Sequence, residues 1–417
     1  MDTYIYISIL VKFEGGCNML GVSKRVEDIR FSEIRKFIPY SDKAKANGIK
    51  VHHLNIGQPD IKTPDEFLNA IKNFDKKIVE YENSQGNKDL VDAFVNYYKS
   101  ININLDNEDI YITNGGSEAI LYALLTICDV GNNIIVPEPY YTNYNTLAKM
   151  AGVDIISFRT YREDGFRIKS KEDILNSIDD NTKAIMITNP SNPTGVVYTK
   201  EEIRMISDVA KEKDLFIISD EVYREFVYDG LKFTSFMDMK DILDRVIIID
   251  SVSKRYSACG ARIGALICKN RNVTDNVMKM CQARLSVSSL DQVGATNLMN
   301  VTKEYIEDVR VEYEKRRNIL YEGLCDIPGV HCEKPSGAFY IIAKLPIDNS
   351  DDFTKWMLKD FQYNNTTVMI TPAEGFYSTK GLGKDEVRLS YCIDSEDLKE
   401  SMLILKEALK KYNKLTK

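Results

Sequence analysis

Three short segments of the chain carry side chains that could form a chemical site. The first supplies an amide, the second a carboxylate beside a phenol, and the third two hydroxyls, a lysine amine and a guanidinium. They read Asn189-Pro-Ser-Asn192-Pro-Thr-Gly195, Asp220-Glu-Val-Tyr223, and Ser251-Val-Ser253-Lys254 with Arg262 eight residues further on. Taken singly, each has an ordinary structural explanation, because Asn, Pro and Gly form turns and Asp caps helices. Together, in this order and each directly after an apolar run, they indicate a functional site.

The elements that position these segments are short runs of apolar, mostly β-branched residues. Such runs, separated by helical stretches, are typical of buried strands in a parallel sheet that helices cover on both faces. The runs that we predict as strands are Asp109–Thr113, Asn133–Val136, Asp154–Phe158, Ala184–Thr188, Leu215–Ser219, Val246–Asp250 and Ala265–Cys268. The stretches that we predict as helices, from apolar residues at three- and four-residue spacing, are Ser117–Thr126, Asn143–Met150 and Lys200–Lys213. The fold class that follows is α/β, with a mostly parallel doubly wound sheet and a site at the carboxyl ends of its strands.

A second, smaller domain is predicted from a change of pattern in the last quarter of the chain. From about Val311 to Glu322 the sequence indicates a long charged helix, and a mixed helix and strand pattern follows. The length of 417 residues agrees with two or three domains, at roughly 150 residues each. We therefore predict an N-terminal arm and part of the small domain at 19–60, a large domain at 61–310, and a small α+β domain at 311–417.

The first 18 residues are expected to lie outside the working protein. Tyr4–Val11 is an apolar run that is too short to span a bilayer. It also lacks the basic start and the small-residue cleavage site of a signal peptide. A second methionine, Met19, precedes a better helical start. We expect residues 1–18 to be an upstream-start artefact or a loose arm.

Composition and charge exclude several classes of protein. With 44% hydrophobic and 28% charged residues, the chain resembles a soluble globular enzyme and not a disordered or collagen-like protein. Because 55 basic residues stand against 62 acidic ones, for a net charge of −7, neither a nucleic acid nor a membrane is an expected partner. The eight cysteines form no C-x-x-C pair and only three histidines accompany them, which argues against a metal site and indicates a reducing, cytoplasmic location.

In its chemical segments the chain resembles the fold-type I pyridoxal phosphate-dependent aminotransferases, the family of the aspartate, alanine and aromatic aminotransferases. The resemblance covers nearly the whole chain, from about Val22 to Lys410. Its most specific motif runs from Ser251 to Gly264 and matches the family pattern at every restricted position. The resemblance implies an aspartate aminotransferase-like fold, pyridoxal 5'-phosphate as cofactor, and an amino acid and a 2-oxo acid as substrates.

Several roles around the cofactor ring are implied by the resemblance. Lys254 would form a Schiff base with the cofactor aldehyde, and its freed amine would then move the proton at the substrate Cα. Asp220 would keep the pyridine nitrogen protonated, so that the ring accepts electrons. Tyr223 and Asn192 would hydrogen-bond the phenolic oxygen of the ring.

The cofactor phosphate is expected at a helix N-terminus, where backbone N–H groups favour anions. The resemblance implies a cup made by Gly116, Ser117, Ser251, Ser253 and Arg262.

Tyrosines complete the implied cofactor site. Tyr141 would stack on the ring, with Tyr140 as a competing choice. Tyr81 matches the tyrosine that reaches the phosphate from the neighbouring subunit, so a homodimer with shared active sites is implied.

For the substrate, Arg388 matches the arginine that binds the α-carboxylate through two parallel hydrogen bonds. Gly57 matches a backbone contact beside it, and Asn192 is also implied to contact substrate. Arg284, four residues before Ser288, matches the side-chain-binding arginine of many aspartate aminotransferases, although the usual Ser-Asn-Pro-Pro continuation is absent. On this basis we predict amino transfer from aspartate to 2-oxoglutarate.

Other activities remain open at this point, because a fold does not fix a reaction. Alanine and aromatic amino acids are the alternative donors, and β-elimination by a C–S lyase is an alternative reaction on the same scaffold. A nicotinamide-dependent dehydrogenase is disfavoured, since no G-x-G-x-x-G turn follows an early strand.

Overall fold

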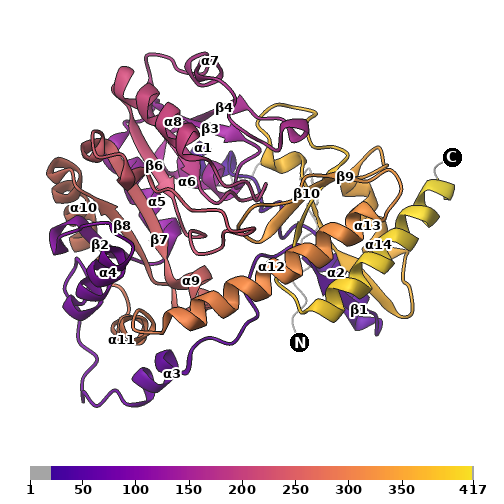
Figure 1. Cartoon of the computed structure of the whole chain (residues 1–417), viewed down its shortest axis with the longest axis horizontal. Coiled ribbons are helices and arrows are strands. Elements are labelled where there is room, and N and C mark those ends of the chain that lie inside the picture. The colour runs from indigo at the N-terminus through magenta and orange to yellow at the C-terminus, as the bar shows by residue number, and fades with distance from the viewer. Residues whose placement is uncertain (1–19, 416–417) are drawn as a thin grey trace.

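A seven-stranded sheet forms the centre of the larger part of the molecule (Figure 1). In the computed structural model, which describes residues 20–415, the strand order is β2-β8-β7-β6-β5-β3-β4. The neighbouring strands are parallel, except that β8 runs antiparallel to both β2 and β7. The strands are β2 (Ile110–Thr113), β3 (Asn133–Glu138), β4 (Asp154–Arg159), β5 (Thr182–Thr188), β6 (Phe216–Asp220), β7 (Val246–Ser251) and β8 (Gly264–Cys268). Each strand overlaps one predicted run, with ends that differ by at most two residues, and the predicted mostly parallel α/β fold is confirmed.

Both faces of this sheet are covered by helices, which explains why its strands are apolar at nearly every position. Along β7, for example, Ile247 and Ile249 belong to one apolar cluster, whereas Ile248 belongs to the cluster on the opposite face. The first face packs against α5 (Gly116–Ile127), α6 (Asn143–Ala151) and α10 (Arg271–Arg284). The opposite face packs against α4 (Lys88–Ser100), α8 (Lys200–Glu212) and α11 (Ser289–Leu298).

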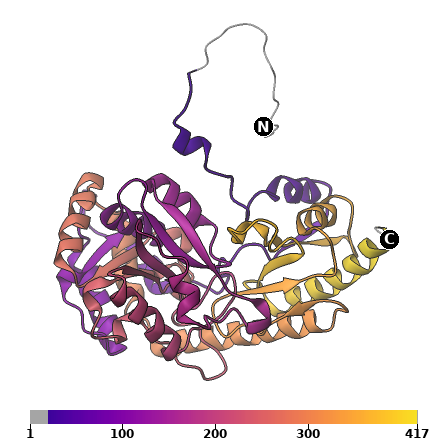
Figure 2. The same cartoon turned by 90° about the horizontal axis from the view of Figure 1, so that it is seen from above.

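The smaller part of the molecule contains two further sheets. A four-stranded antiparallel sheet has the order β12-β13-β10-β9, and a parallel pair joins β1 to β11. Through β1, a segment from near the start of the described chain lies beside its C-terminal region. Figure 2 shows the indigo chain that precedes this segment reaching the body of the molecule between the two parts. The strands are β1 (Lys50–His53), β9 (His331–Cys332), β10 (Tyr340–Lys344), β11 (Thr366–Met369), β12 (Thr371–Pro372) and β13 (Glu386–Ser390).

Helix α12 (Lys303–Cys325) crosses the front of the molecule in Figure 1 and joins the two parts. It begins before the predicted Val311, because Thr302 caps it and Val309 is already buried. The predicted division at residues 310 and 311 therefore falls inside a helix, and the domain boundaries stay a prediction. The remaining helices are α1 (Lys24–Glu27), α2 (Ile38–Ala46), α3 (Asp65–Lys72), α7 (Lys171–Leu175), α9 (Val252–Arg255), α13 (Ser350–Lys359) and α14 (Ser395–Leu415).

Two expectations concern the ends of the chain and membranes. The expectation for residues 1–18 lies outside the described residues. None of the helices within residues 20–415 combines the length and apolar character needed to cross a lipid bilayer.

At the start of β8, Gly264 allows three backbone segments to meet. A Cβ atom at this position would lie 2.5 Å from the carbonyl carbon of Gly115, 2.7 Å from the nitrogen of Gly116 and 2.9 Å from the carbonyl oxygen of Asp250. All three are backbone atoms of packed elements and cannot turn aside as a side chain could. Glycine at 264 therefore brings the turn before α5 against the end of β7, where the predicted phosphate-binding residues lie.

We expect Gly264→Ala to lower the free energy of unfolding by about 1–3 kcal/mol, the usual cost of overpacking. The matched control is Gly260→Ala, because a Cβ at Gly260 meets no atom within 4 Å. Urea unfolding followed by circular dichroism measures both changes. Equal midpoints for the two variants would contradict the close approach at Gly264.

Candidate functional site

A cavity of about 510 Å³ opens where β5, β6 and β7 end. This volume suits a small-molecule site. Parallel strands place their carboxyl ends at one edge of the sheet, so the three chemical segments meet here. The predicted residues that line the cavity are Gly57, Gly116, Ser117, Tyr141, Asn192, Asp220, Tyr223, Ser251, Ser253, Lys254, Arg262 and Arg388.

Lys254 lies on the one-turn helix α9, directly after β7. Its Nζ donates a hydrogen bond of 2.7 Å to the carbonyl oxygen of Gly57. The turn begins with Ser251, whose Oγ accepts a hydrogen bond from the Ser253 nitrogen. On the other side of Lys254, the buried Arg255 binds Asp250 at 3.0 Å. These contacts fix the turn, so that the lysine amine is presented to the cavity.

Asp220 ends strand β6 and is 6% exposed. Its Oδ2 accepts a hydrogen bond of 2.6 Å from the Tyr144 hydroxyl on α6. Burial raises the pKa of Asp220 to about 6, against the opposing effect of the Tyr144 hydrogen bond. A buried carboxylate with one side-chain donor is well suited to accept a hydrogen bond from a protonated ring nitrogen. Tyr144 was not predicted, because a tyrosine on the apolar face of a helix reads as a core residue.

Two phenols meet in the cavity wall. The hydroxyls of Tyr223 and Tyr340 are 2.8 Å apart, and burial followed by the neighbouring phenol raises the pKa of Tyr223 well above its usual value. A Cβ at Gly57 would lie 1.9 Å from the Tyr340 hydroxyl, so only glycine fits there. Tyr340 was not predicted as a site residue, because it lies in an apolar run of the sequence. Its hydroxyl could have indicated a role outside the core, since a buried phenol needs a hydrogen-bond partner.

Arg388, on β13, is a buried guanidinium that lacks an anionic partner within residues 20–415. It is 1% exposed, and burial lowers its pKa. One Nη donates to the Asn192 side chain at 2.9 Å and the other to the backbone oxygen of Asn55 at 2.6 Å, whereas Nε has no partner. Its guanidinium lies over the Tyr340 ring, 4.4 Å from the centroid. Because a buried unpaired charge is costly, this arginine is suited to bind an anionic ligand.

Hydroxyls and a guanidinium also line the cavity near the N-terminus of α5. Gly116 and Ser117 form the first turn of this helix. The Ser251 hydroxyl lies 2.8 Å from that of Ser253, and Arg262 reaches across to the carbonyl oxygen of Asn114 at 3.4 Å. The free N–H groups and the positive helix end favour an anion such as a phosphate.

Two predicted residues do not line the cavity of this chain. Tyr81 is 80% exposed. Arg284 binds Glu118 at 3.0 Å and two backbone carbonyl oxygens, so its guanidinium already has partners. Of the competing tyrosines, Tyr141 lines the cavity, whereas the Tyr140 hydroxyl bonds side chains outside its lining.

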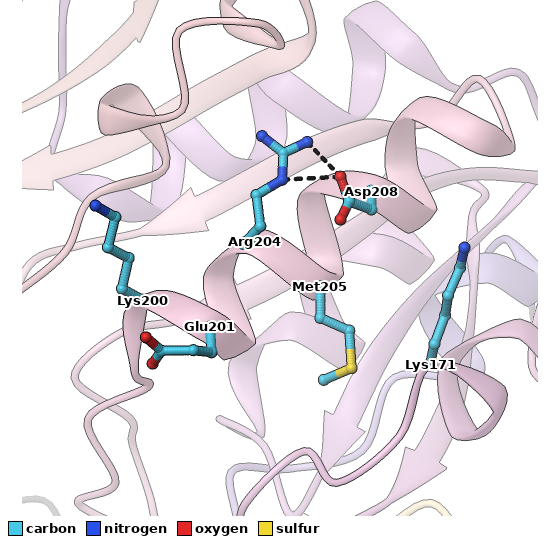
Figure 3. Close-up of a pocket in the computed structure, with 6 residues that line it drawn as sticks. All are labelled: Lys171, Lys200, Glu201, Arg204, Met205 and Asp208. Atoms are coloured by element: carbon cyan, nitrogen blue, oxygen red, sulfur yellow. Dashed lines mark hydrogen bonds and ion pairs between the residues drawn. The ribbon is translucent and has the colours of Figure 1, made fainter.

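A second hollow lies on the outer side of α8 (Figure 3) and contains none of the predicted site residues. Three of its charged groups are in ion pairs: Arg204 binds Asp208 and Asp241, and Lys171 binds Glu212. The six residues that line it are Lys171, Lys200, Glu201, Arg204, Met205 and Asp208. We interpret this hollow as a solvated, salt-bridged surface.

One cluster with metal-ligand chemistry occurs within residues 20–415. Ligand atoms of His52, Asp397 and Glu400 lie within 4.8 Å of one another. The Lys50 ammonium lies 2.9 Å from Asp397 and 3.7 Å from Glu400. A cation of the chain itself thus already pairs with these carboxylates.

Comparisons with known proteins show the family to which the chain belongs. The family described as aminotransferase class I and II matches residues 49–402. An aspartate aminotransferase of Bacillus subtilis is 31% identical over 402 residues, which cover 94% of this chain and 100% of the relative. An aromatic-amino-acid aminotransferase of Thermococcus litoralis is 32% identical over 399 residues, which cover 94% and 99%. The solved structure of an alanine aminotransferase from Pyrococcus furiosus matches with a TM-score of 0.85 at 28% identity, covering 94% of this chain and 100% of the other. The chain therefore belongs to the class I and II aminotransferases.

Proposed function

We propose that the protein binds pyridoxal 5'-phosphate in the cavity and moves the amino group of an amino acid, with aspartate favoured, to a 2-oxo acid such as 2-oxoglutarate. One observation carries the proposal: the same cavity contains the Lys254 amine and the buried Arg388 guanidinium, which has no anionic partner among residues 20–415. An amine that can bind an aldehyde and a cation that can bind a carboxylate are both needed for amino transfer from an amino acid.

The groups around the cavity fit this cofactor. The α5 N-terminus with Ser117, Ser251, Ser253 and Arg262 offers the donors that a phosphate needs. Asp220 would hold the ring nitrogen in its protonated form, and Tyr223 and Asn192 would donate hydrogen bonds to the ring oxygen. When bound, the cofactor supplies a conjugated ring that takes up the electron pair left when the substrate Cα–H bond breaks.

The side chains of this protein would divide the remaining work. Arg388 would hold the substrate α-carboxylate with two N–H donors, which fixes the orientation of the Cα–H bond. Lys254 Nζ would accept the proton that leaves Cα and later return one, as a general base and acid. Its hydrogen bond to the Gly57 carbonyl at 2.7 Å shows that the amine lies beside the segment that also supports Arg388.

The preference for aspartate rests on the name of one close relative and on the resemblance of the sequence. The Bacillus subtilis relative is an aspartate aminotransferase. Aromatic amino acids and alanine are the runner-up donors, because the Thermococcus litoralis and Pyrococcus furiosus proteins carry those names.

The direct test is to incubate the purified protein with cofactor, single amino acids and 2-oxoglutarate. We expect glutamate and the matching 2-oxo acid, fastest with aspartate, and Lys254→Ala to bind cofactor without measurable turnover. Borohydride treatment followed by peptide mass spectrometry should find the cofactor attached to Lys254 in the wild type only.

Lys213→Ala, at an exposed position after α8, is the matched control and should behave as wild type. Pyruvate plus ammonia in place of glutamate would indicate β-elimination. Near-normal activity of Lys254→Ala would contradict the assignment of the amine.

A second prediction concerns the cost of keeping Asp220 buried. Its folded-state pKa of about 6 lies above the ordinary 3.8, so the cofactor-free native state binds the proton more tightly than the unfolded state does. Its stability therefore falls as the pH rises from about 4 to about 6, and the charged carboxylate costs about 3 kcal/mol above that range. We expect Asp220→Asn to raise the stability of the cofactor-free protein at pH 7 by up to this amount, with a smaller gain at pH 5.

Thermal unfolding of the cofactor-free protein at the two pH values measures this effect, and Asp180→Asn, at an exposed position, is the control. The Asp220→Asn variant should nevertheless lose activity when cofactor is added. If Asp220→Asn lowers the stability equally at both pH values, burial of the Asp220 carboxylate does not raise its pKa.

A third prediction concerns assembly. We propose a homodimer in which Tyr81 serves the phosphate of the neighbouring site. Its segment exposes three large apolar or aromatic side chains within four residues, Ile78 (68%), Val79 (61%) and Tyr81 (80%), and exposed apolar surface of this kind is typical of an interface. Loss of one hydrogen bond to a charged group should weaken cofactor binding in Tyr81→Phe by about tenfold or more.

The control for this variant is Tyr161→Phe, at another exposed tyrosine. Cofactor affinity is measured by equilibrium dialysis, and the assembly by analytical ultracentrifugation at the assay concentration. A fully active monomer would refute the shared site.

A further inference from the structure

Four basic side chains line the cavity, and three of them have a role in the proposed reaction. Lys254, Arg262 and Arg388 serve the amine chemistry, the phosphate and the α-carboxylate. The fourth is Arg35, from the segment between α1 and α2. Its guanidinium forms no hydrogen bond or ion pair with another residue of the described chain. An exposed cation at the cavity without a partner is available to a ligand.

The backbone on either side of Arg35 is anchored, so this cation is not on a free arm. The Asn55 side chain donates a hydrogen bond of 3.1 Å to the carbonyl oxygen of Ile34. Lys36, on the other side, binds Glu33 at 2.6 Å and also pairs with Asp351. Ile34 packs against the buried cluster that contains Phe376.

The same Asn55 connects Arg35 to the substrate arginine. Its backbone oxygen accepts the 2.6 Å hydrogen bond from Arg388, while its side chain holds the residue before Arg35. Two guanidinium groups therefore line one cavity, and a single residue bonds the guanidinium of one and the backbone next to the other. A ligand with two carboxylates, one at each end of a short chain, matches such a pair of cations.

Arg284, which the sequence suggested for this role, is less available within the chain. Its guanidinium is 15% exposed and is balanced by Glu118. Removing it from Glu118 would leave a partly buried carboxylate without its partner.

We propose that Arg35 is the specificity-determining residue of the substrate site, and that it binds the second carboxylate of a dicarboxylic amino acid or 2-oxo acid while Arg388 binds the first. This inference rests on the proposed function. It predicts that Arg35 discriminates four- and five-carbon dicarboxylates from monocarboxylates and takes no part in the proton transfer.

The test compares Arg35→Gln with Arg30→Gln and Arg284→Gln, all as cofactor-loaded protein. Arg30 is an exposed arginine of the same arm that does not line the cavity, so its variant has the same change of charge. Single-turnover amino transfer from aspartate or alanine, without a 2-oxo acid, avoids any effect on the dicarboxylic acceptor. Binding of succinate and of butyrate, measured by calorimetry, gives a readout that is independent of turnover.

We expect Arg35→Gln to slow the reaction with aspartate, and to weaken succinate binding, by about tenfold or more, the cost of one charge-assisted hydrogen bond. Alanine and butyrate should change less than twofold, and Arg35→Lys should recover part of the loss. Equal effects on both donors, or a selective loss in Arg30→Gln or Arg284→Gln instead, would overturn the inference. Wild-type protein that transfers no amino group from any donor would contradict the proposed function itself, whereas an active enzyme with an unselective Arg35→Gln would contradict only the role of Arg35.

Discussion

The buried ion pair between Asp250 and Arg255 is the interaction on which the site depends. The two side chains are fully buried, lie 3.0 Å apart, and are bracketed by Tyr98, which donates to Asp250, and by Tyr97, whose ring lies under the Arg255 guanidinium. Removing one partner of such a pair costs about 3–5 kcal/mol, because the other charge stays buried. The pair therefore joins the last turn of α9 to the end of β7 and fixes the backbone that carries Lys254. Rigid support of this kind is what lets a flexible lysine act at a defined place.

The cavity itself has the opposite character, because its polar groups are left incompletely paired by the rest of the protein. Arg388 Nε has no hydrogen-bond partner, and Asp220 is held at a raised pKa by burial. The unpaired Nε and the buried carboxylate each lower the stability of the folded chain. Apolar side chains in their place would not carry this cost. The Asp250–Arg255 ion pair and the incompletely paired groups of the cavity are complementary. The ion pair stabilises the geometry of the site, and the incompletely paired groups are available to ligands.

The sequence predicted the strands well because a sheet covered on both faces demands apolar residues at successive positions, and that demand is local. It could not predict the direction of β8, since an apolar run such as Ala265–Cys268 looks the same in either orientation; the pairing of Ser251 with Gly264 decides it. The residues at strand ends were predictable because each chemical group follows its own run. Tyr340 and Arg35 were not, because nothing local separates a cavity phenol from a core tyrosine, or a cavity arginine from a surface one. Their places depend on β10 and on the N-terminal segment meeting β7 in space.

That meeting is arranged by the short segment from Leu54 to Gly57. The backbone oxygen of Asn55 accepts a hydrogen bond from Arg388, and the backbone oxygen of Gly57 accepts one from Lys254. Leu54, just before them, bonds to both β11 and β13 through its backbone. The Arg388 guanidinium lies on the smaller part of the molecule and the Lys254 amine on the larger part. Residues 55–57 bond both the guanidinium and the amine. This short segment therefore sets the spacing between the two groups, and a shift of its backbone would move both contacts together.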